Sequence, residues 1–326
     1  MLENYDAFDT DLRFYKGNLH SHTTNSDGKL TPSEMVAIYK EAGYSFLALT
    51  DHNLFSDYSS EFDSDSFTII PGAEATVLWL YKKDYYLARK CHHLLVFKDP
   101  YKESFGFEHL QPIDVLKLYG KEVDFNLESQ KFINDLKERG AVLCYNHPLW
   151  SRVNDEDFLS LNGLDLIEIY NWGTELDSSA GFDISSFQKF LERDVHINAI
   201  ATDDNHNHED GELFDSLGGF IMVNSPALDK NEIMKSLLAG RYYSSSGAFI
   251  NNWGIRNGKA YIEAVNARYI FLTVGPGVRS AQVKLCDSAE FELPKEIKYF
   301  RFEVIDKNGK RAWTNPYWVK DAFTLE

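Results

Sequence analysis

The stretch Gly17–Met35, GNLHSHTTNSDGKLTPSEM, decides the fold class because the end of a strand, a pair of histidines and the start of a helix follow one another within it. The strand-like run ends at His20 and His22. Thr31-Pro32-Ser33-Glu34 then supplies a cap residue, a first-turn proline and an acid, so a helix is expected to begin here and to end at Gly43. A strand followed by a helix is the repeating unit of α/β proteins.

Short apolar runs alternate with segments of helical periodicity from about residue 14 to about residue 250. This alternation is the order of elements expected of an α/β fold. A further helix is expected over Asn126–Gly140, where Leu127, Phe132, Ile133 and Leu136 form an apolar face. We expect strands at residues 13–19, 45–49, 67–70, 93–97, 141–145, 164–169 and 197–201.

The tail from about residue 251 differs from the rest of the chain, because strand-like runs follow one another there with turn signals between them. Asp306-Lys307-Asn308-Gly309-Lys310 is typical of a hairpin turn. We therefore expect an α/β domain over residues 1–250 and a small β-rich domain over residues 251–326. Residues 98–124 are polar and aromatic without clean periodicity, which indicates an insertion that could shape the site.

The composition favours a soluble protein of a reducing compartment. The 326-residue chain is 44% apolar and has a formal net charge of −17. Its three cysteines include no Cys-x-x-Cys pair, which argues against a disulfide framework and a thiolate zinc site. The acidic N-terminus is unlike a signal peptide, and no stretch reaches the length of a membrane span. We expect a cytoplasmic protein without a membrane partner, and the acidic balance argues against binding a long nucleic acid.

Histidines and carboxylates follow most of the predicted strands. In an α/β barrel the C-terminal ends of the strands meet on one rim, where active sites are built, so these side chains are expected to converge. The imidazoles of His20 and His22 share one side of the chain because strand side chains alternate, and neutral imidazole suits Zn, Fe and Mn. The candidates for a shared metal site are His20, His22, Asp27, His52, Glu74, His93, His147, Asp204 and His206.

Several of these candidates also have a structural interpretation. Asp27, in Asn25-Ser26-Asp27-Gly28, is typical of a turn residue, and His52 could be a hydrogen-bonded core histidine. Glu74 follows an apolar run, where a carboxylate is costly unless it is paired or binds a cation. An exposed loop position is the alternative for Glu74.

Neighbouring polar residues leave further alternatives open. Because strand side chains alternate, one of His92 and His93 would point into the site while the other points away, and we choose His93. Glu168 lies inside its strand, where it could orient a ligand or form a structural ion pair. The remaining alternatives near Asp204 and His206 are Asp203 and His208, whereas His109 and His196 are interpreted as ordinary residues.

Taken together, these motifs resemble the PHP family, the polymerase and histidinol phosphatase domain. The resemblance covers roughly residues 14–250 and rests on separate elements that recur in order. The earlier elements are His20-Ser21-His22-Thr23, Ser26-Asp27-Gly28, Pro32 at a helix start and Thr50-Asp51-His52. The later elements are Pro71-Gly72-Ala73-Glu74, His93-Leu94-Leu95, Asn146-His147-Pro148 and Asp204-Asn205-His206.

The resemblance implies a distorted, TIM-like (β/α)7 barrel with two or three divalent metal ions, Zn, Mn or Fe, at its C-terminal rim. In the family's pattern, the first ion is held by His20, His22, Glu74 and Asp204, and Glu74 bridges to a second ion held by His93 and His147. Asp27, His52 and His206 hold a third ion, and many relatives have a histidine where Asp27 stands. The tail with residues 311–316 is similar to stand-alone PHP hydrolases with a short β extension, a branch that includes carbamate and aryl-ester hydrolases.

A cluster of this kind predicts metal-dependent hydrolysis, because bound cations lower the pKa of a water and neutralise charge on phosphoryl oxygens. We expect a phosphoesterase acting on a small phosphorylated substrate, with Asp51 as a catalytic residue that orients a ligand histidine. Arg152 and Lys16 lie close in sequence to ligands and could bind an anionic group, with an ordinary surface position as the alternative. The competing hypotheses are hydrolysis of a carboxyl or carbamate ester by the same cluster, and a non-catalytic barrel that serves as a binding module.

Overall fold

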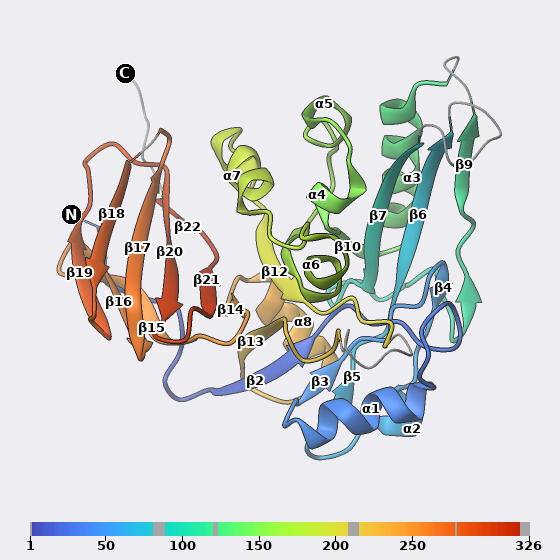
Figure 1. Cartoon of the computed structure of the whole chain (residues 1–326), viewed down its shortest axis with the longest axis horizontal. Coiled ribbons are helices and arrows are strands. Elements are labelled where there is room, and N and C mark those ends of the chain that lie inside the picture. The colour runs from blue at the N-terminus through green and yellow to red at the C-terminus, as the bar shows by residue number, and fades with distance from the viewer. Residues whose placement is uncertain (1, 81–88, 120–122, 208–214, 278, 320–326) are drawn as a thin grey trace.

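The strands of the computed structural model form four sheets over the described residues, which are 2–80, 89–119, 123–207, 215–277 and 279–319. The six-stranded sheet has the order β12-β11-β10-β7-β6-β9 (Figure 1). Its strands are β6 (Gly72–Leu80), β7 (Arg89–Lys98), β9 (Leu116–Tyr119), β10 (Ala141–Tyr145), β11 (Leu166–Asn171) and β12 (Asn198–Thr202).

The ten-stranded sheet runs from the tail of the chain into the histidine-rich part. Its order is β18-β17-β20-β21-β14-β13-β2-β3-β5, and β22 pairs with β20. Its strands are β2 (Arg13–Asn18), β3 (Phe46–Leu47), β5 (Thr68–Ile69), β13 (Phe220–Ser225), β14 (Tyr242–Ser245), β17 (Ala267–Gly275), β18 (Arg279–Lys284), β20 (Tyr299–Asp306), β21 (Arg311–Thr314) and β22 (Tyr317–Trp318).

The two large sheets meet at two seams, each of which contains an isolated β-bridge. At the first seam Ser21, just after β2, pairs with Asn205, just after β12. At the second seam His52, beyond β3, pairs with Glu74 in β6. Between the sheets lies a buried apolar cluster to which β3, β7, β10, β11, β12, β13 and β14 contribute, so the two sheets enclose a common core.

Eight helices are present among the described residues, and the longer ones cover the sheets. The sequence explains where they begin: Thr31 caps α1 through the amide of Glu34, and Asp124 caps α3 through the amide of Leu127. Buried faces of α3 and α7 pack on β10 and β11, and α8 packs on β13. The helices are α1 (Pro32–Glu41), α2 (Ser59–Phe62), α3 (Phe125–Glu138), α4 (Pro148–Ser151), α5 (Asp155–Phe158), α6 (Trp172–Ser178), α7 (Ile184–Glu192) and α8 (Lys230–Leu238). None of them is long and apolar enough to cross a bilayer.

The mixed α/β class is confirmed, whereas a TIM-like barrel is not. All seven predicted strands exist, with ends that differ by a few residues. However, β7 runs antiparallel to both β6 and β10, and the ladder between the sheets is reduced to single bridges at the two seams. The sequence pattern marks the apolar runs but carries no information on strand direction, which depends on contacts between distant segments.

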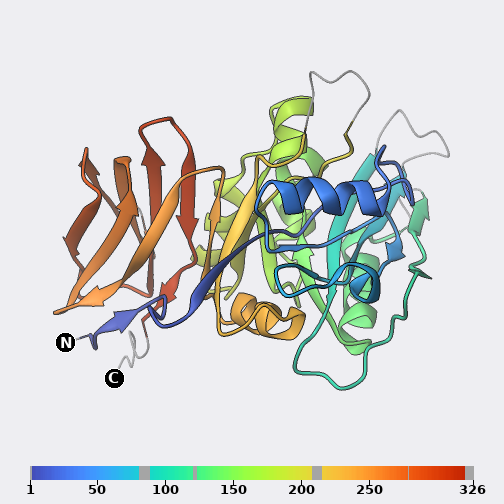
Figure 2. The same cartoon turned by 90° about the horizontal axis from the view of Figure 1, so that it is seen from below.

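The tail forms a two-layer β sandwich beside the histidine-rich part (Figure 2). One layer is the four-stranded sheet β1-β15-β16-β19, made of β1 (Tyr5–Asp6), β15 (Phe249–Arg256), β16 (Lys259–Val265) and β19 (Ser288–Glu292). The other layer is the β18-β17-β20-β21 end of the ten-stranded sheet. Trp253, Ile262, Phe300 and Phe302 are buried between the layers. The predicted boundary at residue 250 falls inside β15, and the N-terminal strand β1 belongs to the sandwich.

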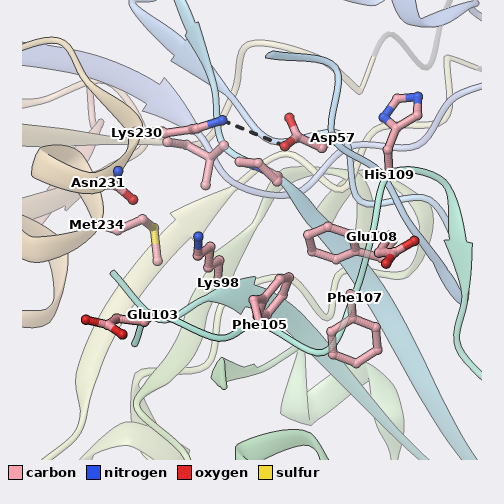
Figure 3. A pocket seen from close by; sticks show the side chains of 13 residues that line it. Asp57, Lys98, Glu103, Phe105, Phe107, Glu108, His109, Lys230, Asn231 and Met234 are labelled. Atoms are coloured by element: carbon pink, nitrogen blue, oxygen red, sulfur yellow. Dashed lines mark ion pairs between the residues drawn. The ribbon is translucent and has the colours of Figure 1, made fainter. Parts of the chain in front are cut away.

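The predicted insertion at residues 98–124 contains two short strands and lines a cavity of about 450 Å³ (Figure 3). Strand β8 (Gln111–Pro112) pairs with β4 (Leu54–Phe55), and β9 joins the edge of the six-stranded sheet. Phe105 and Phe107 face this cavity, opposite Lys230 of α8, which forms an ion pair with Asp57. In the part of the chain that the structure describes, this cavity shares no lining residue with the histidine-rich one.

Candidate metal centre

Histidines and carboxylates from both sheets converge in three groups, and each group has the donor atoms that a metal ion requires. Within each group one ligand atom per residue lies within 4.8 Å of the others. Glu74 belongs to two groups, as does His22, so the groups are contiguous. The groups are His20, His22, Glu74 and Asp204; Glu74, His93 and His147; and His22, Asp27, His52 and His206.

The first group is the most deeply buried. The Nε2 atoms of His20 and His22 are 3.2 Å apart, and the Oδ1 atom of Asp204 lies 3.1 Å and 2.9 Å from them. Glu74 Oε1 lies 3.3 Å from His20 Nε2. Four ligands at about 2.0–2.1 Å around a tetrahedral ion are about 3.3 Å from one another, so these separations match the edges of a first-row metal site.

The second group contains a buried nitrogen that lacks a hydrogen bond among the described residues. The Nε2 atom of His93 is 3.1 Å from the Cys91 sulfur, while its Nδ1 atom is buried without a hydrogen-bond partner and lies 4.0 Å from Glu74 Oε1. His147 Nε2 lies 3.3 Å from the same carboxylate oxygen. A buried polar atom without a partner is costly, and a metal ion at this place would satisfy it.

The third group lies at the mouth of the site. Asp27 Oδ1 is 3.4 Å from His206 Nε2, and Asp27 Oδ2 is 3.4 Å from His52 Nε2. The Asp27 side chain is 55% exposed, against 0% for His22. Gly28 permits the turn that carries Asp27, because a Cβ atom on Gly28 would lie 2.3 Å from the His22 carbonyl oxygen.

Two candidate ligands have strained backbones. His147 has φ 27° and Asp204 has φ 53°, in or near the left-handed region that side chains other than glycine rarely adopt. Each such residue costs on the order of 1–3 kcal/mol, and such strain is concentrated at functional sites. Asp204 keeps this conformation through a hydrogen bond from its amide to the His20 carbonyl at the first seam.

Behind the ligands, a set of buried polar side chains fixes their orientation. Glu168 Oε1 accepts from His20 Nδ1 at 3.0 Å and also bonds to the Thr202 hydroxyl, which leaves His20 Nε2 for the first group. Asn146 donates to Glu74 at 2.8 Å, and Asn171 donates to Asp204 at 2.9 Å. Two interpretations were left open for Glu168. These contacts favour the one in which it orients a ligand.

Burial and neighbouring charges shift the pKa values of the site's histidines in opposite directions, so that some are neutral and others protonated. Burial and the neighbouring His52 and His206 lower the pKa of His22 to about 4, and burial lowers the pKa of His93 to about 3. These two imidazoles are therefore neutral donors. Burial opposes protonation of His52, but the carboxylates of Glu74 and Asp27 outweigh it and raise its pKa to about 11. A cation bound between the groups would take the place of such protons.

The structure brings all nine predicted ligand candidates together but places three other predicted site residues elsewhere. Lys16 points its ammonium over the rings of Tyr44 and Phe220, at 4.0 Å and 4.3 Å. Arg152 is exposed, and neither basic residue lines the cavity of the metal groups. Asp51 is buried, but its carboxylate accepts from Thr23 and Ser26 in the loop that carries Asp27. These hydrogen bonds position that loop.

The alternatives left open by the sequence are also placed. His92 points away from the groups and bonds to the Tyr145 hydroxyl at 2.7 Å, while Asp203 accepts from the amides of residues 217, 218 and 219. His208 lies outside the described residues. The sequence analysis missed Asn146, Asn171, Trp150 and Asp215, although Asn146 and Trp150 are next to or near His147 in a motif already singled out.

The fold and these donor groups define a mixed α/β protein with a candidate metal centre. The model of the PHP domain matches residues 18–143, which confirms the resemblance over that part of the chain. The match contains six of the nine ligand candidates, and His147, Asp204 and His206 lie beyond it. No curated protein sequence matches the chain.

Solved structures similar to this chain have low sequence identity. One is a two-domain protein from Bacteroides vulgatus containing a predicted PHP-like metal-dependent phosphoesterase, with 15% identity, coverage of 98% of this chain and 97% of that chain, and a TM-score of 0.46. Another is an amidohydrolase from Chromobacterium violaceum, solved with bound sulfate and no metal, with 15% identity, coverage of 69% and 96%, and a TM-score of 0.42. Neither likeness is close enough to assign an activity.

Proposed function

We propose that this protein is a metal-dependent hydrolase and that its substrate is a small phosphate ester. The observation that carries the proposal is the sharing of Glu74 between two donor groups, because a shared carboxylate holds two ions close together. Divalent ions held by these groups would supply a water of lowered pKa as nucleophile and would stabilise the charge that develops on the ester. The PHP match over residues 18–143 supports the same class of chemistry.

The chain's own residues would orient the reacting groups and exclude bulk water. His20, His22, Glu74 and Asp204 would hold the first ion, and Glu74, His93 and His147 the second. These side chains are almost fully buried, and Glu74, His93, His147 and Asp204 also line a cavity of about 510 Å³. Asp27, His52 and His206 line this cavity and, with His22, would hold a third ion.

The test is elemental analysis combined with a substrate panel. The protein is stripped with a chelator, reloaded separately with Mn, Zn or Fe(II), and assayed on p-nitrophenyl phosphate and bis(p-nitrophenyl) phosphate. We expect two or three ions per chain and hydrolysis that is lost on stripping and restored on reloading. Glu74→Gln should lower both metal content and kcat/KM, whereas Glu138→Gln, an exposed position at the end of α3, should change neither. Loaded protein that is inert to both esters would exclude a phosphoesterase.

A second candidate, hydrolysis of a carboxyl or carbamate ester, is favoured by the cavity lining. Among its described lining residues there is no lysine or arginine to bind a phosphate, which an uncharged ester would not need. The same loaded protein is therefore assayed on p-nitrophenyl acetate and a p-nitrophenyl carbamate. Activity on these esters without activity on the phosphate esters would select this candidate. A protein that retains no metal at all would instead favour a non-catalytic binding module.

A further inference from the structure

A cavity of about 800 Å³ lies between helix α7 and the β17–β20 face of the sandwich (Figure 1). One wall is formed by Ile184, Gln188 and Glu192, which are four residues apart and therefore share one face of α7. The other wall includes Thr273 of β17 and Arg301 of β20, which are paired in register and so share one face of the sheet. In the part of the chain that the structure describes, this cavity has no lining residue in common with the cavity of the metal groups.

The position of Arg301 in its strand explains why a charged side chain is buried here. Its neighbours Phe300 and Phe302 belong to the core between the two layers of the sandwich. Because strand side chains alternate, Arg301 points to the opposite face of the sheet, towards α7. Only 5% of its surface is exposed. An arginine is rarely buried to this extent unless its charge is paired.

Most of the hydrogen-bond donors of this guanidinium are unsatisfied. One Nη2 hydrogen goes to Gln188 Oε1 at 3.1 Å, whereas Nε and Nη1 are buried and have no hydrogen-bond partner among the described residues. Since Gln188 also lines the cavity, the guanidinium end of Arg301 lies at the cavity wall. The Phe187 ring, at 5.7 Å, stabilises the charge but accepts none of these in-plane hydrogens. An oxyanion in the cavity would satisfy them.

The two acids that line the cavity have other partners. Asp155 forms an ion pair with Lys189 at 2.8 Å, and Glu192 Oε1 accepts from the Tyr299 hydroxyl at 2.8 Å. Among the described residues, neither acid forms an ion pair with Arg301. The counter-charge of this buried guanidinium therefore does not come from these two carboxylates.

We infer that this cavity is a binding site for a small carboxylate with an apolar body, whose carboxylate group pairs with Arg301. The planar guanidinium offers parallel N–H groups that match the two oxygens of a carboxylate. The apolar body would pack on Leu159 and Ile184, which line the same cavity. The site is separate from the donor groups, so binding there requires neither metal nor turnover.

The first experiment measures binding to the full chain, both Mn-loaded and stripped of metal. The protein is titrated calorimetrically with hexanoate, with hexanamide, which has the same length without the charge, and with acetate, which has the charge without the body. We expect hexanoate to bind roughly tenfold more tightly than either compound, in the loaded and in the stripped protein. Hexanoate should also raise the Tm, because it binds the folded state.

Variants test whether the ligand pairs with Arg301. Arg301→Met should abolish hexanoate binding, and Arg301→Lys should retain part of it, because lysine keeps the charge but lacks the planar fork. Arg13→Met is the matched control, since it makes the same change at an exposed strand position and should retain full binding. Thr273→Phe keeps Arg301 and fills part of the cavity, so it should also weaken binding if Arg301→Met fails to fold. Circular dichroism establishes the fold of each variant.

Four results would overturn the inference: equal affinities for hexanoate and hexanamide, an affinity unchanged in Arg301→Met and Thr273→Phe, binding in the metal-loaded form alone, or no binding at millimolar hexanoate. Inorganic phosphate that binds more tightly than hexanoate would overturn the choice of a carboxylate. The proposed function is judged separately by hydrolysis of the phosphate esters. Arg301→Met lies outside the donor groups and should hydrolyse them at the parent rate.

Discussion

Glu168 is not one of the ligand candidates, but it fixes the orientation of several of them. Its carboxylate accepts from His20 Nδ1 at 3.0 Å, from the amide of His147 at 2.8 Å and from the Asn171 side chain at 2.8 Å. It therefore sets the tautomer of one ligand and the backbone position of another. Such supporting partners typically contribute 10–100-fold to metal affinity or activity.

We predict that Glu168→Gln lowers the affinity for the metal of the first group roughly 10–100-fold without unfolding the protein, because the amide keeps the shape but loses the charge that orients His20. Competition with a fluorescent chelator measures the affinity. Glu138→Gln is the matched control, since it makes the same change on an exposed helix end. An unchanged affinity in Glu168→Gln would show that the carboxylate acts only in packing.

The donor groups also differ in burial, which predicts that they release metal at different rates. The side chains of Asp27, His52 and His206 are 55%, 29% and 21% exposed, while those of His20, His22 and Glu74 are 0%, 0% and 1% exposed. We expect Asp27→Asn to lose the ion of the third group and to retain the other two. Elemental analysis after exhaustive dialysis measures this. Equal loss of all ions would contradict it.

At the residue scale the sequence predicted that the nine ligand candidates converge, whereas it did not predict where the basic residues lie. His20, Glu74 and Asp204 are polar residues next to apolar runs, a pattern that has few structural explanations. Lys16 and Arg152 are near ligand candidates in sequence, but the Lys16 ammonium lies over the rings of Tyr44 and Phe220, Arg152 has a left-handed backbone, and neither side chain lines the cavity. Such directions depend on backbone angles that the sequence does not display.

At the scale of single elements, α1 is the helix whose start the sequence specifies most completely. Thr31 accepts from the Glu34 amide at 3.3 Å, and Glu34 Oε2 accepts from the Thr31 amide at 2.8 Å. The buried residues Met35, Val36 and Tyr39 then follow on one face. The capping motif and the spacing of apolar residues are local, so both were predicted.

We predict that Thr31→Ala lowers the free energy of unfolding by about 1 kcal/mol, since it removes the cap while leaving the buried face of α1 unchanged. Urea unfolding followed by circular dichroism measures the change. Thr31→Ser, which keeps the hydroxyl, should behave nearly as the parent protein. Metal content should be the same in all three proteins, and a loss of metal in Thr31→Ala would contradict a purely local role.

The strands β6 and β7 meet in a direction that the sequence of either strand alone could not predict. Glu74 was expected at the exit of a strand, but it is the third residue of β6, and His93 lies in the middle of β7. The two meet because β7 is antiparallel to β6, with His93 paired with Thr76. Strand direction reverses which end of an element reaches the site, and it is fixed by pairing between strands.

At the scale of the whole molecule, the sandwich and the metal-bearing part share one sheet. Strand β21 pairs with both β20 and β14, and β14 pairs with β13, which pairs with β2. Trp313 in β21 packs in the core cluster of the α/β part. The sequence showed the change in composition near residue 250. It did not show the shared ladder, because that ladder joins segments more than 60 residues apart.

We predict that the two parts unfold together. Phe302→Ala removes a fully buried side chain from the sandwich and should lower the free energy of unfolding by about 3–5 kcal/mol. Because the ladder is continuous, hydrogen exchange of β10 and of β17 should show the same shift in urea midpoint. Phe249→Ala, at a position that is 43% exposed, is the control and should cost much less. Separate midpoints for β10 and β17 would contradict the prediction.

The two seams have a consequence for the lifetime of the folded state. At each seam a single backbone bridge joins the large sheets, and ligand candidates from opposite sides face one another there, His20 and His22 with Asp204, and His52 with Glu74. An ion coordinated across a seam is a cross-link that must dissociate before the sheets separate. Chelation should therefore accelerate spontaneous opening and digestion by proteases, even under conditions where the native population hardly changes.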